Sequence, residues 1–376
     1  MALDKFIEKG GKKLRYGYTT GSCATAAAKG AVTSLLSGQL CSEVTIDTPK
    51  GWPLTLELID CEFTEEWARC GVQKDAGDDP DVTDGLQIYV RAELTDQEGI
   101  QLLAGEGVGT VTLKGLSVPP GEPAINPVPR EMICNEVNQV LSDYNCNKGV
   151  LLEFTIPGGA EIAKRTFNPR LGVVGGLSII GTTGIVEPMS EQALKETMAV
   201  ELSILEGKGY RDIIFVPGNY GKNFVRSLGL DTDKLVKISN YVGFMFEKSE
   251  KMSIDRILFV GHLGKMIKVA GGIFHTHSSV ADGRLEIMAA HAALLGAGQK
   301  CIEQIMAATT TDDAMEAIDQ EHLPGYYDHL AEVIKRKCEE KVFHHKKVEV
   351  ILFSNKAGYL GQSKEAEKLK ERLCIH

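Results

Sequence analysis

The sequence lacks long apolar runs and has few aromatic residues, and each shortage excludes a class of protein. No stretch approaches the 18 or more consecutive apolar residues that a membrane-spanning helix needs, so no span is expected. The opening residues, MALDKFIEKGGKKLRYG, are charged and show neither an apolar core nor a small-residue cleavage site, so no secretory signal is expected either.

The cysteines are numerous but show none of the spacings of a zinc site or a redox pair. Their number is odd, which argues against a disulfide framework. Free thiols are typical of a reducing compartment, so we expect a cytoplasmic protein with no metal ion bound by the protein itself. The nine cysteines are at positions 23, 41, 61, 70, 134, 146, 301, 338 and 374.

Basic residues are fewer than acidic residues, and this limits which binding partners we expect. The net charge is −10, and no basic tract carries interleaved aromatic residues, so we expect no nucleic-acid partner. A local basic pocket could still bind an anionic small molecule. Proline is scarce beside glycine, with 13 prolines against 40 glycines, and glycine in tight turns lets backbone approach ligands closely. This glycine excess is a first indication of an enzyme.

The length of 376 residues predicts two domains, because a single core rarely grows that large. The first half mixes short β-branched runs with two helical stretches, at about 22–37 and from Arg130 onward, and indicates an α+β domain. We place this domain at residues 1–165 and a second domain at 166–376.

The second half alternates apolar runs, small-residue turns and helical stretches. Runs such as DIIFVPGNYG and RILFVGHLGK are nearly continuous in apolar residues, as strands buried on both faces are. Strand, glycine turn and helix in repetition predict a doubly wound, mostly parallel α/β domain of Rossmann-like type. The run LSIIGTTG is expected to be one of its strands, and Ser190 is expected to cap the helix that follows.

Residues 14–31, LRYGYTTGSCATAAAKGA, place small polar residues at the front of an alanine-rich helix. Free backbone amides and the helix dipole make such a start a candidate anion site. Thr19, Thr20 and Ser22 add hydroxyl groups, and Gly21 allows close approach. A well-capped helix that packs closely against a sheet explains the same pattern, and the spacing alone leaves both interpretations open.

The stretch CGVQKDAGDDPDVTDG is rich in aspartate. Its carboxylates could bind a divalent cation, hold ribose hydroxyls or attract a sulfonium, although the spacing is not that of an EF-hand. A solvated acidic turn is the simpler interpretation. The aspartates are Asp75, Asp78, Asp79, Asp81 and Asp84.

The stretch GGIFHTHSSVADGRLEIMAAHAALLGA concentrates titratable residues. His275 and His277 would share one face if the segment were a strand. Asp282 and Gly283 predict a turn before Arg284, which would open a helix. The combination suits acid–base work or carboxylate binding better than a metal site, which would need a third ligand. A polar loop with one structural histidine is the alternative.

The turns that follow the apolar runs should gather at one sheet edge. In open α/β sheets, ligands bind at the carboxyl ends of the strands. We therefore expect a cofactor site there, with lysines supplying positive charge. The cofactor-binding candidates are Thr182, Thr183, Gly218, Asn219, Gly221, Asn240 and Gly261.

Eight segments together resemble the CbiD family. In order they are GYTTGSCATAAAKGA, KDAGDDPDVT, GEGVGT, GEPAINPVPR, TFNPRLGVVGG, GTTGIVEPMS, VPGNYG and AGGIFHTHSSVADGRLE. The resemblance runs from about residue 14 to 300 and extends more loosely to FSNKAG at 353–358. It implies an S-adenosylmethionine-dependent cobalt-precorrin-5B C1-methyltransferase of anaerobic cobalamin biosynthesis, which forms cobalt-precorrin-6A.

The implied reaction moves a methyl group from a sulfonium to a ring carbon of a tetrapyrrole that brings its own cobalt. Such a displacement depends on alignment and exclusion of water, so we assign roles from chemistry. His275 or His277 is the candidate base, with Asp282 to orient it. Acetate and propionate arms call for cationic and hydroxyl partners. The substrate-binding candidates are Thr19, Thr20, Gly21, Ser22, Arg130, Arg170, Lys265 and Arg284, with Lys268 as a further cation of the same region.

Two other functions stay open on the sequence. A small-molecule kinase would use residues 18–23 as a phosphate loop, with magnesium held by the acidic stretch. A carrier without catalysis would use His275 and His277 as axial ligands of the cobalt. Neither the domain that holds the methyl donor nor an assembly of identical chains can be decided from the sequence.

Overall fold

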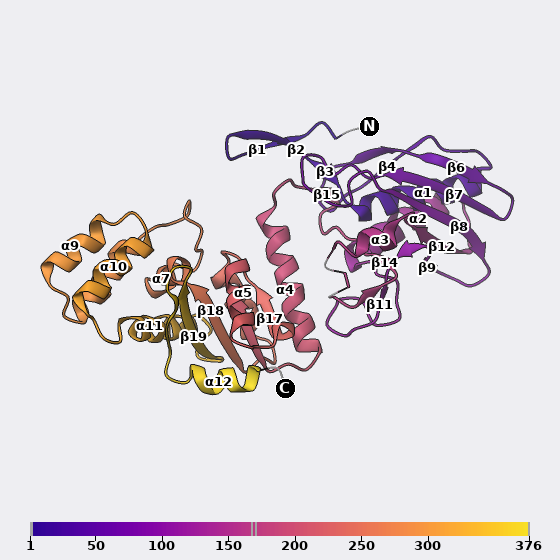
Figure 1. The fold of residues 1–376 in the computed structure, drawn as a ribbon. Coiled ribbons are helices and arrows are strands. Elements are labelled where there is room, and N and C mark those ends of the chain that lie inside the picture. Colours follow the sequence, from indigo (N-terminus) through magenta and orange to yellow (C-terminus); the bar gives the residue numbers. More distant parts are fainter. Residues whose placement is uncertain (1–2, 167, 170, 375–376) are drawn as a thin grey trace. The chain divides into compact units, whose positions relative to one another are not determined.

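The computed structural model describes residues 3–166, 168–169 and 171–374. The chain forms two compact units, Met1–Glu191 and Gln192–His376, each with its own core. The fold class is as predicted, with an α+β unit followed by a mostly parallel α/β unit (Figure 1).

The first unit begins with short strands and one long helix. Its elements are β1 (Phe6–Lys9), β2 (Lys12–Arg15), β3 (Gly17–Tyr18), α1 (Thr20–Ser37), β4 (Glu43–Ile46), β5 (Leu54–Glu57), β6 (Ile59–Phe63), β7 (Trp67–Gln73), β8 (Gln87–Thr95), β9 (Ile100–Ala104), β10 (Gly107–Val108), β11 (Thr110–Val111), α2 (Pro127–Asp143), β12 (Gly149–Thr155), α3 (Gly159–Ala163), β13 (Val173–Val174), β14 (Gly176–Leu177) and β15 (Ile185–Val186).

A five-stranded sheet in the order β6-β7-β8-β12-β9 carries the first core, with β12 antiparallel to β8 and parallel to β9. Helix α1 packs against β7, β8 and α2 and is buried almost all round. Alanine and glycine make this close packing feasible: a Cβ on Gly30 would lie 2.4 Å from the Leu58 side chain. The alanine-rich sequence of α1 therefore reflects a helix that is covered on almost every side.

Helix α2 begins earlier than the sequence indicated. We expected it to begin at Arg130, whereas it begins at Pro127 with Asn126 as the N-cap. Prolines fit the first turn because the amide hydrogen they lack has no acceptor within the helix there.

The two compact units divide after Glu191, whereas the sequence placed the boundary between residues 165 and 166. The intervening segment pairs with strands of the first unit: β13 with β11, β14 with β10 and β15 with β3. Pairing between segments far apart in the chain has no local signature, which is why composition misplaced the boundary. The run LSIIGTTG was also predicted wrongly, because it is not a strand of the parallel sheet.

The second unit alternates strands and helices as predicted. Its elements are α4 (Glu191–Gly207), β16 (Asp212–Val216), α5 (Asn219–Ser227), the 3₁₀ helix η1 (Thr232–Lys234), β17 (Leu235–Lys237), α6 (Val242–Glu250), β18 (Arg256–His262), α7 (Leu263–Ala270), α8 (Arg284–Leu294), α9 (Gln299–Ala307), α10 (Thr311–Glu321), α11 (Tyr326–Lys341), β19 (Lys347–Ser354), β20 (Gly358–Gln362) and α12 (Ala366–Leu373).

The second sheet has the order β17-β16-β18-β19-β20, with four parallel strands and β20 antiparallel at the edge. Side chains of α5 and α12 join the core on one face, and those of α4, α6, α7 and α11 join the core on the other. The chain thus leaves β16 toward one face and β18 toward the other. This reversal creates a topological switch point between the carboxyl ends of β16 and β18.

Candidate active site

The start of α1 is occupied by the chain itself. The amide of Gly21 donates to the carbonyl of Ile180 (3.0 Å), and the hydroxyl of Thr20 contacts the same residue. The Ser22 amide donates to the Thr19 hydroxyl (3.2 Å), and the Ser22 hydroxyl donates to the carbonyl of Gly184 (2.6 Å). All four predicted binding residues, Thr19, Thr20, Gly21 and Ser22, are buried.

The segment 180–184 therefore takes the place that the sequence suggested for a ligand. A Cβ on Gly181 would lie 2.3 Å from the Thr19 hydroxyl oxygen, so the backbone passes directly over the cap. Thr182 and Thr183 belong to this segment and not to a strand end of the parallel sheet, where we expected them. Of the two interpretations left open by the sequence, the capped helix is the one that these contacts describe.

Each aspartate of the acidic stretch has a partner within the first unit. Asp75 accepts two hydrogen bonds from the Arg15 guanidinium, at 2.6 and 2.7 Å, and this bonding lowers the pKa of Asp75. The further acceptors are Asp78 for the Arg15 amide, Asp79 for the Met189 amide, Asp81 for the Lys74 ammonium and Asp84 for the Ala76 amide.

These contacts fix the acidic stretch onto β2 and β3. A Cβ on Gly17 would lie 2.2 Å from the backbone of Ala76, which shows how closely the stretch packs against β3. Within the described residues, no three His, Cys, Asp or Glu side chains gather into a set able to hold a metal ion.

Several predicted residues do meet at the carboxyl edge of the second sheet. Gly218 and Asn219 follow β16, Asn240 follows β17, and Gly261 is the penultimate residue of β18, with Lys265 in α7 directly after it. Because β16 and β18 are neighbours, their following loops meet at the switch point: the Lys265 ammonium donates to the carbonyl of Pro217 (3.1 Å).

The glycines at this edge have different roles. A Cβ on Gly218 would meet nothing within 4 Å, and no side chain caps α5 there, so the helix start is open to a ligand. In contrast, a Cβ on Gly261 would lie 2.4 Å from the Met266 sulfur, and one on Gly221 would lie 2.9 Å from the Val216 side chain. Gly221 and Gly261 thus permit helix and strand to pack closely, and Gly218 leaves space for a ligand.

The histidine stretch, residues 271–283, forms a loop across this edge and not a strand. Residues 271–283 contain one isolated bridge, between His275 and Tyr241, and their rings meet edge-on at 5.0 Å between centroids. Thr276 donates its amide hydrogen to the carbonyl of Asn240 (2.9 Å), which fixes the loop to the end of β17. His277 is exposed, and its Nδ1 accepts the Ser279 amide hydrogen (3.2 Å).

Among the described contacts, Asp282 forms no hydrogen bond with either histidine and instead pairs with Arg284. The Arg284 guanidinium donates from Nε to Oδ1 (2.8 Å) and from Nη2 to Oδ2 (2.9 Å). This pairing, with the amide of Gly283, keeps the pKa of Asp282 well below its ordinary value. As predicted, Arg284 begins a helix, but the Asp–His pair that we expected to orient a base is absent from the described contacts.

Two lysines of α7 lie behind the loop. Burial, together with the nearby charge of Lys268, lowers the pKa of Lys265. Lys268 itself is only 3% exposed, and its ammonium donates to the carbonyls of Ala281 (2.9 Å) and Thr276 (3.3 Å). Lys268 therefore contacts loop backbone where the sequence suggested a partner for substrate carboxylates.

His262 is a candidate that the sequence analysis missed. It ends β18 at the switch point, and its Nδ1 accepts the amide hydrogen of Gly264 (3.1 Å), which caps α7. The neutral ring therefore carries its proton on Nε2. Burial lowers the pKa of His262 by more than the negative charge of Asp312 raises it, so the neutral form is favoured. The signal in the sequence was a histidine directly after a buried apolar run.

Of the two remaining predicted arginines, one has a structural role. Arg130 donates to the carbonyls of Ile125 (2.7 Å) and Pro123 (2.9 Å), and so it braces the turn before α2. Arg170 lies outside the described residues.

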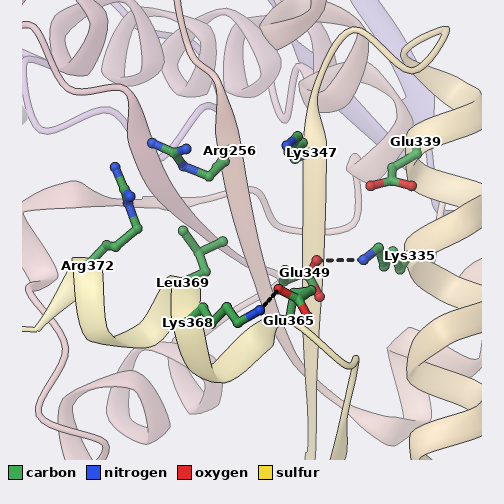
Figure 2. A pocket seen from close by; sticks show the side chains of 9 residues that line it. All are labelled: Arg256, Lys335, Glu339, Lys347, Glu349, Glu365, Lys368, Leu369 and Arg372. Atoms are coloured by element: carbon green, nitrogen blue, oxygen red, sulfur yellow. Dashed lines mark hydrogen bonds and ion pairs between the residues drawn. The ribbon is translucent and has the colours of Figure 1, made fainter.

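A pocket of about 450 Å³ lies at the other end of the second sheet (Figure 2). Arg256 and Lys347, the first residues of β18 and β19, line it, and Lys335 pairs there with Glu349 (2.6 Å). Five cationic side chains and three carboxylates line it. Because the pocket lies at the amino ends of the parallel strands, it is not the carboxyl-edge site that the topology favours.

Comparison with known proteins identifies relatives along the whole chain. The sequence model described as CbiD matches residues 7–188, and that of the CbiD C-terminal domain matches residues 275–364. A protein of Thermoanaerobacter sp. (strain X514), named cobalt-precorrin-5B C(1)-methyltransferase, is 47% identical over 96% of this chain and 99% of its own length. One of the same name from Alkaliphilus metalliredigens is 48% identical over 99% of this chain and 98% of its own length.

A solved structure also matches. It is that of a cobalamin biosynthesis protein (cbiD) from Archaeoglobus fulgidus, which is 26% identical and covers 74% of this chain and 87% of its own, with a TM-score of 0.40. None of the described helices combines the length and the apolar character needed to cross a membrane.

Proposed function

Because the chain belongs to the CbiD family, we propose that it transfers a methyl group to carbon 1 of cobalt-precorrin-5B, with S-adenosylmethionine as the donor and cobalt-precorrin-6A as the product. The observation that carries this proposal is the near-half identity to methyltransferases of that name over almost the full length of both chains. Cobalt enters as part of the substrate, so the protein needs no metal ligands of its own.

We place the methyl donor at the open start of α5. The uncapped amides after Gly218 suit the carboxylate of the donor's methionine part, and Asn219 offers a side-chain amide at the same point. Asn219 is held by the Lys237 ammonium, which donates to its Oδ1 (3.2 Å). When bound, the donor supplies a methyl group on a positively charged sulfur, which leaves as a neutral thioether. The chain's task is to hold that methyl group in line with the ring carbon.

The substrate's carboxylate arms need cations, and the carboxyl edge supplies two. Lys265 lies at the switch point, and Arg284 presents a guanidinium whose orientation is fixed by Asp282. A guanidinium held in place loses less conformational entropy when it binds a carboxylate. We therefore propose that Lys265 and Arg284 bind substrate carboxylates.

The two loop histidines have unequal roles in this proposal. Since the Ser279 amide hydrogen points at Nδ1 of His277, the neutral ring holds its proton on Nε2 and acts as a hydrogen-bond donor. His275, packed against Tyr241, is then the proposed base for a ring proton. A cytoplasmic location and the absence of nucleic-acid or membrane partners belong to the same proposal, and the assembly state stays open.

The alternative functions have less support. A kinase would need a free phosphate loop at residues 18–23 and a magnesium site in the acidic stretch, but both are bonded within the first unit. A carrier would bind the tetrapyrrole without changing it, whereas the named relatives are methyltransferases.

The test is calorimetry combined with mass spectrometry. Purified protein should bind S-adenosylhomocysteine, should not bind ATP, and should add one methyl group to cobalt-precorrin-5B when S-adenosylmethionine is present. Binding of ATP without S-adenosylhomocysteine would contradict the proposal, as would tetrapyrrole binding with no gain in mass. His275→Ala should lower kcat, and a wild-type kcat in that variant would remove the base assignment alone.

A further inference from the structure

Lys268 holds the histidine loop at two points. Its ammonium donates to the carbonyls of Thr276 and Ala281, which flank His277 and the exposed residues after it. We propose that Lys268 is a positioning residue of the methyl transfer, which sets the loop so that His275, His277 and Arg284 face the reacting groups. This inference rests on the proposed function of the carboxyl edge.

The burial of Lys268 indicates that the contact is more than incidental. The residue is 3% exposed, and among the described residues no carboxylate pairs with its ammonium. Burying an ammonium without a counter-ion is unfavourable, and the nearby Lys265 adds repulsion. The two loop carbonyls are the groups that offset this cost, so the loop conformation and the buried charge depend on each other.

The rest of the loop has few other restraints. Thr276 is tied to Asn240, while residues 277–280 are exposed and hydrogen-bond mainly with one another. Without the ammonium, the Ala281 end would lose its link to α7. The loop would then sample many conformations, and a misplacement of about 1 Å can reduce a rate about a hundredfold.

The experiment compares the full chain with Lys268→Met, which keeps the aliphatic length and removes the charge and donors. Hydrogen exchange should accelerate about tenfold at the hydrogen-bonded amides of Thr276, Val280 and Ala281, the order expected when the bonds from Lys268 to the Thr276 and Ala281 carbonyls are lost. The amide of Ile273, which donates to the backbone carbonyl of Lys268, should keep its rate. Methyl transfer should lose kcat, by about ten- to a hundredfold, with a smaller change in KM.

A matched control is Lys346→Met. Lys346 is also buried and also donates to a backbone carbonyl, that of Met252, but it precedes β19 at the amino end of the sheet. This variant should leave loop exchange and kcat unchanged. Lys268→Arg, which restores charge and donors, should recover part of the kcat, and Lys268→Gln replaces the methionine variant if the latter does not fold.

The outcomes separate the two proposals. Unchanged exchange at 276–281 in the Lys268 variants would overturn the positioning role, whatever the activity. Faster exchange with wild-type kcat would also overturn it, because the loop would then not act in the reaction. If the wild-type protein transferred no methyl group, the proposed function would fail, and the exchange data would still decide whether Lys268 holds the loop.

Discussion

The buried ion pair between Lys74 and Asp81 allows a sharp test of what the acidic stretch does. The Lys74 side chain is 2% exposed, and its ammonium donates to Asp81 at 2.7 Å. Removing one partner of a buried pair costs about 3–5 kcal/mol because it leaves a buried charge uncompensated. Asp81 is 26% exposed, so water relieves part of that penalty. We expect Asp81→Asn to lower the free energy of unfolding of the first unit by about 2–4 kcal/mol.

Substitution of the other partner, Lys74, should lower the free energy of unfolding by less. Lys74→Met removes the buried charge and keeps the aliphatic length, while the Asp81 carboxylate still accepts hydrogen bonds from the Thr83 amide (2.8 Å) and hydroxyl (2.7 Å). We expect a loss of about 1 kcal/mol or less, and a double variant close to Lys74→Met alone.

Urea unfolding followed by near-ultraviolet absorbance and by hydrogen exchange in β7 and β8 would measure these differences. The order of the two losses is the decisive result. A larger loss for Lys74→Met than for Asp81→Asn would refute the argument that the lysine is the costly buried charge. A rise in thermal stability of the wild-type protein with millimolar Mg²⁺ or Ca²⁺ would show that the stretch is a cation site after all.

Three further predictions concern stability. Gly261→Ala should lower the free energy of unfolding by about 1–3 kcal/mol, measured by urea unfolding, because its Cβ would lie 2.4 Å from the Met266 sulfur. Hydrogen bonds from Arg15 lower the pKa of Asp75, so the pair stabilises the fold above the ordinary carboxyl pKa, and this contribution is lost as pH falls below about 4. Asp75→Asn should therefore weaken the decrease of the melting temperature below about pH 4, measured in thermal melts at a series of pH values. Tyr326→Phe should cost about 1 kcal/mol in urea unfolding, since the buried hydroxyl donates to a backbone carbonyl of α8 (2.9 Å).

The comparison of sequence with structure shows where local signals suffice. The apolar runs of the second half predicted β16 and β18, because strands covered on both faces are apolar along their length. The glycine turns after them predicted a carboxyl-edge site, and the topology does bring Gly218, Asn219 and Lys265 to one switch point.

Local signals failed where a partner from a distant part of the chain decided the outcome. The start of α1 has the same sequence whether its amides meet a ligand or the carbonyls of residues 180 and 184, which lie about 160 positions away. The sequence of the acidic stretch likewise does not show that Arg15 pairs with Asp75 and Lys74 with Asp81. Whether a ligand or a distant part of the chain pairs with these polar groups is decided only by the tertiary fold.

The sequence by itself therefore determined the two-unit α/β class, the family and the position of the histidine loop along the chain. Tertiary structure decided which polar groups remain available to a ligand. Buried donors and acceptors must be paired, and the fold decides which partner lies within hydrogen-bond distance. Backbone carbonyls accept the hydrogen bonds of the donors at the start of α1 and of the Lys268 ammonium. In contrast, no side chain caps the start of α5.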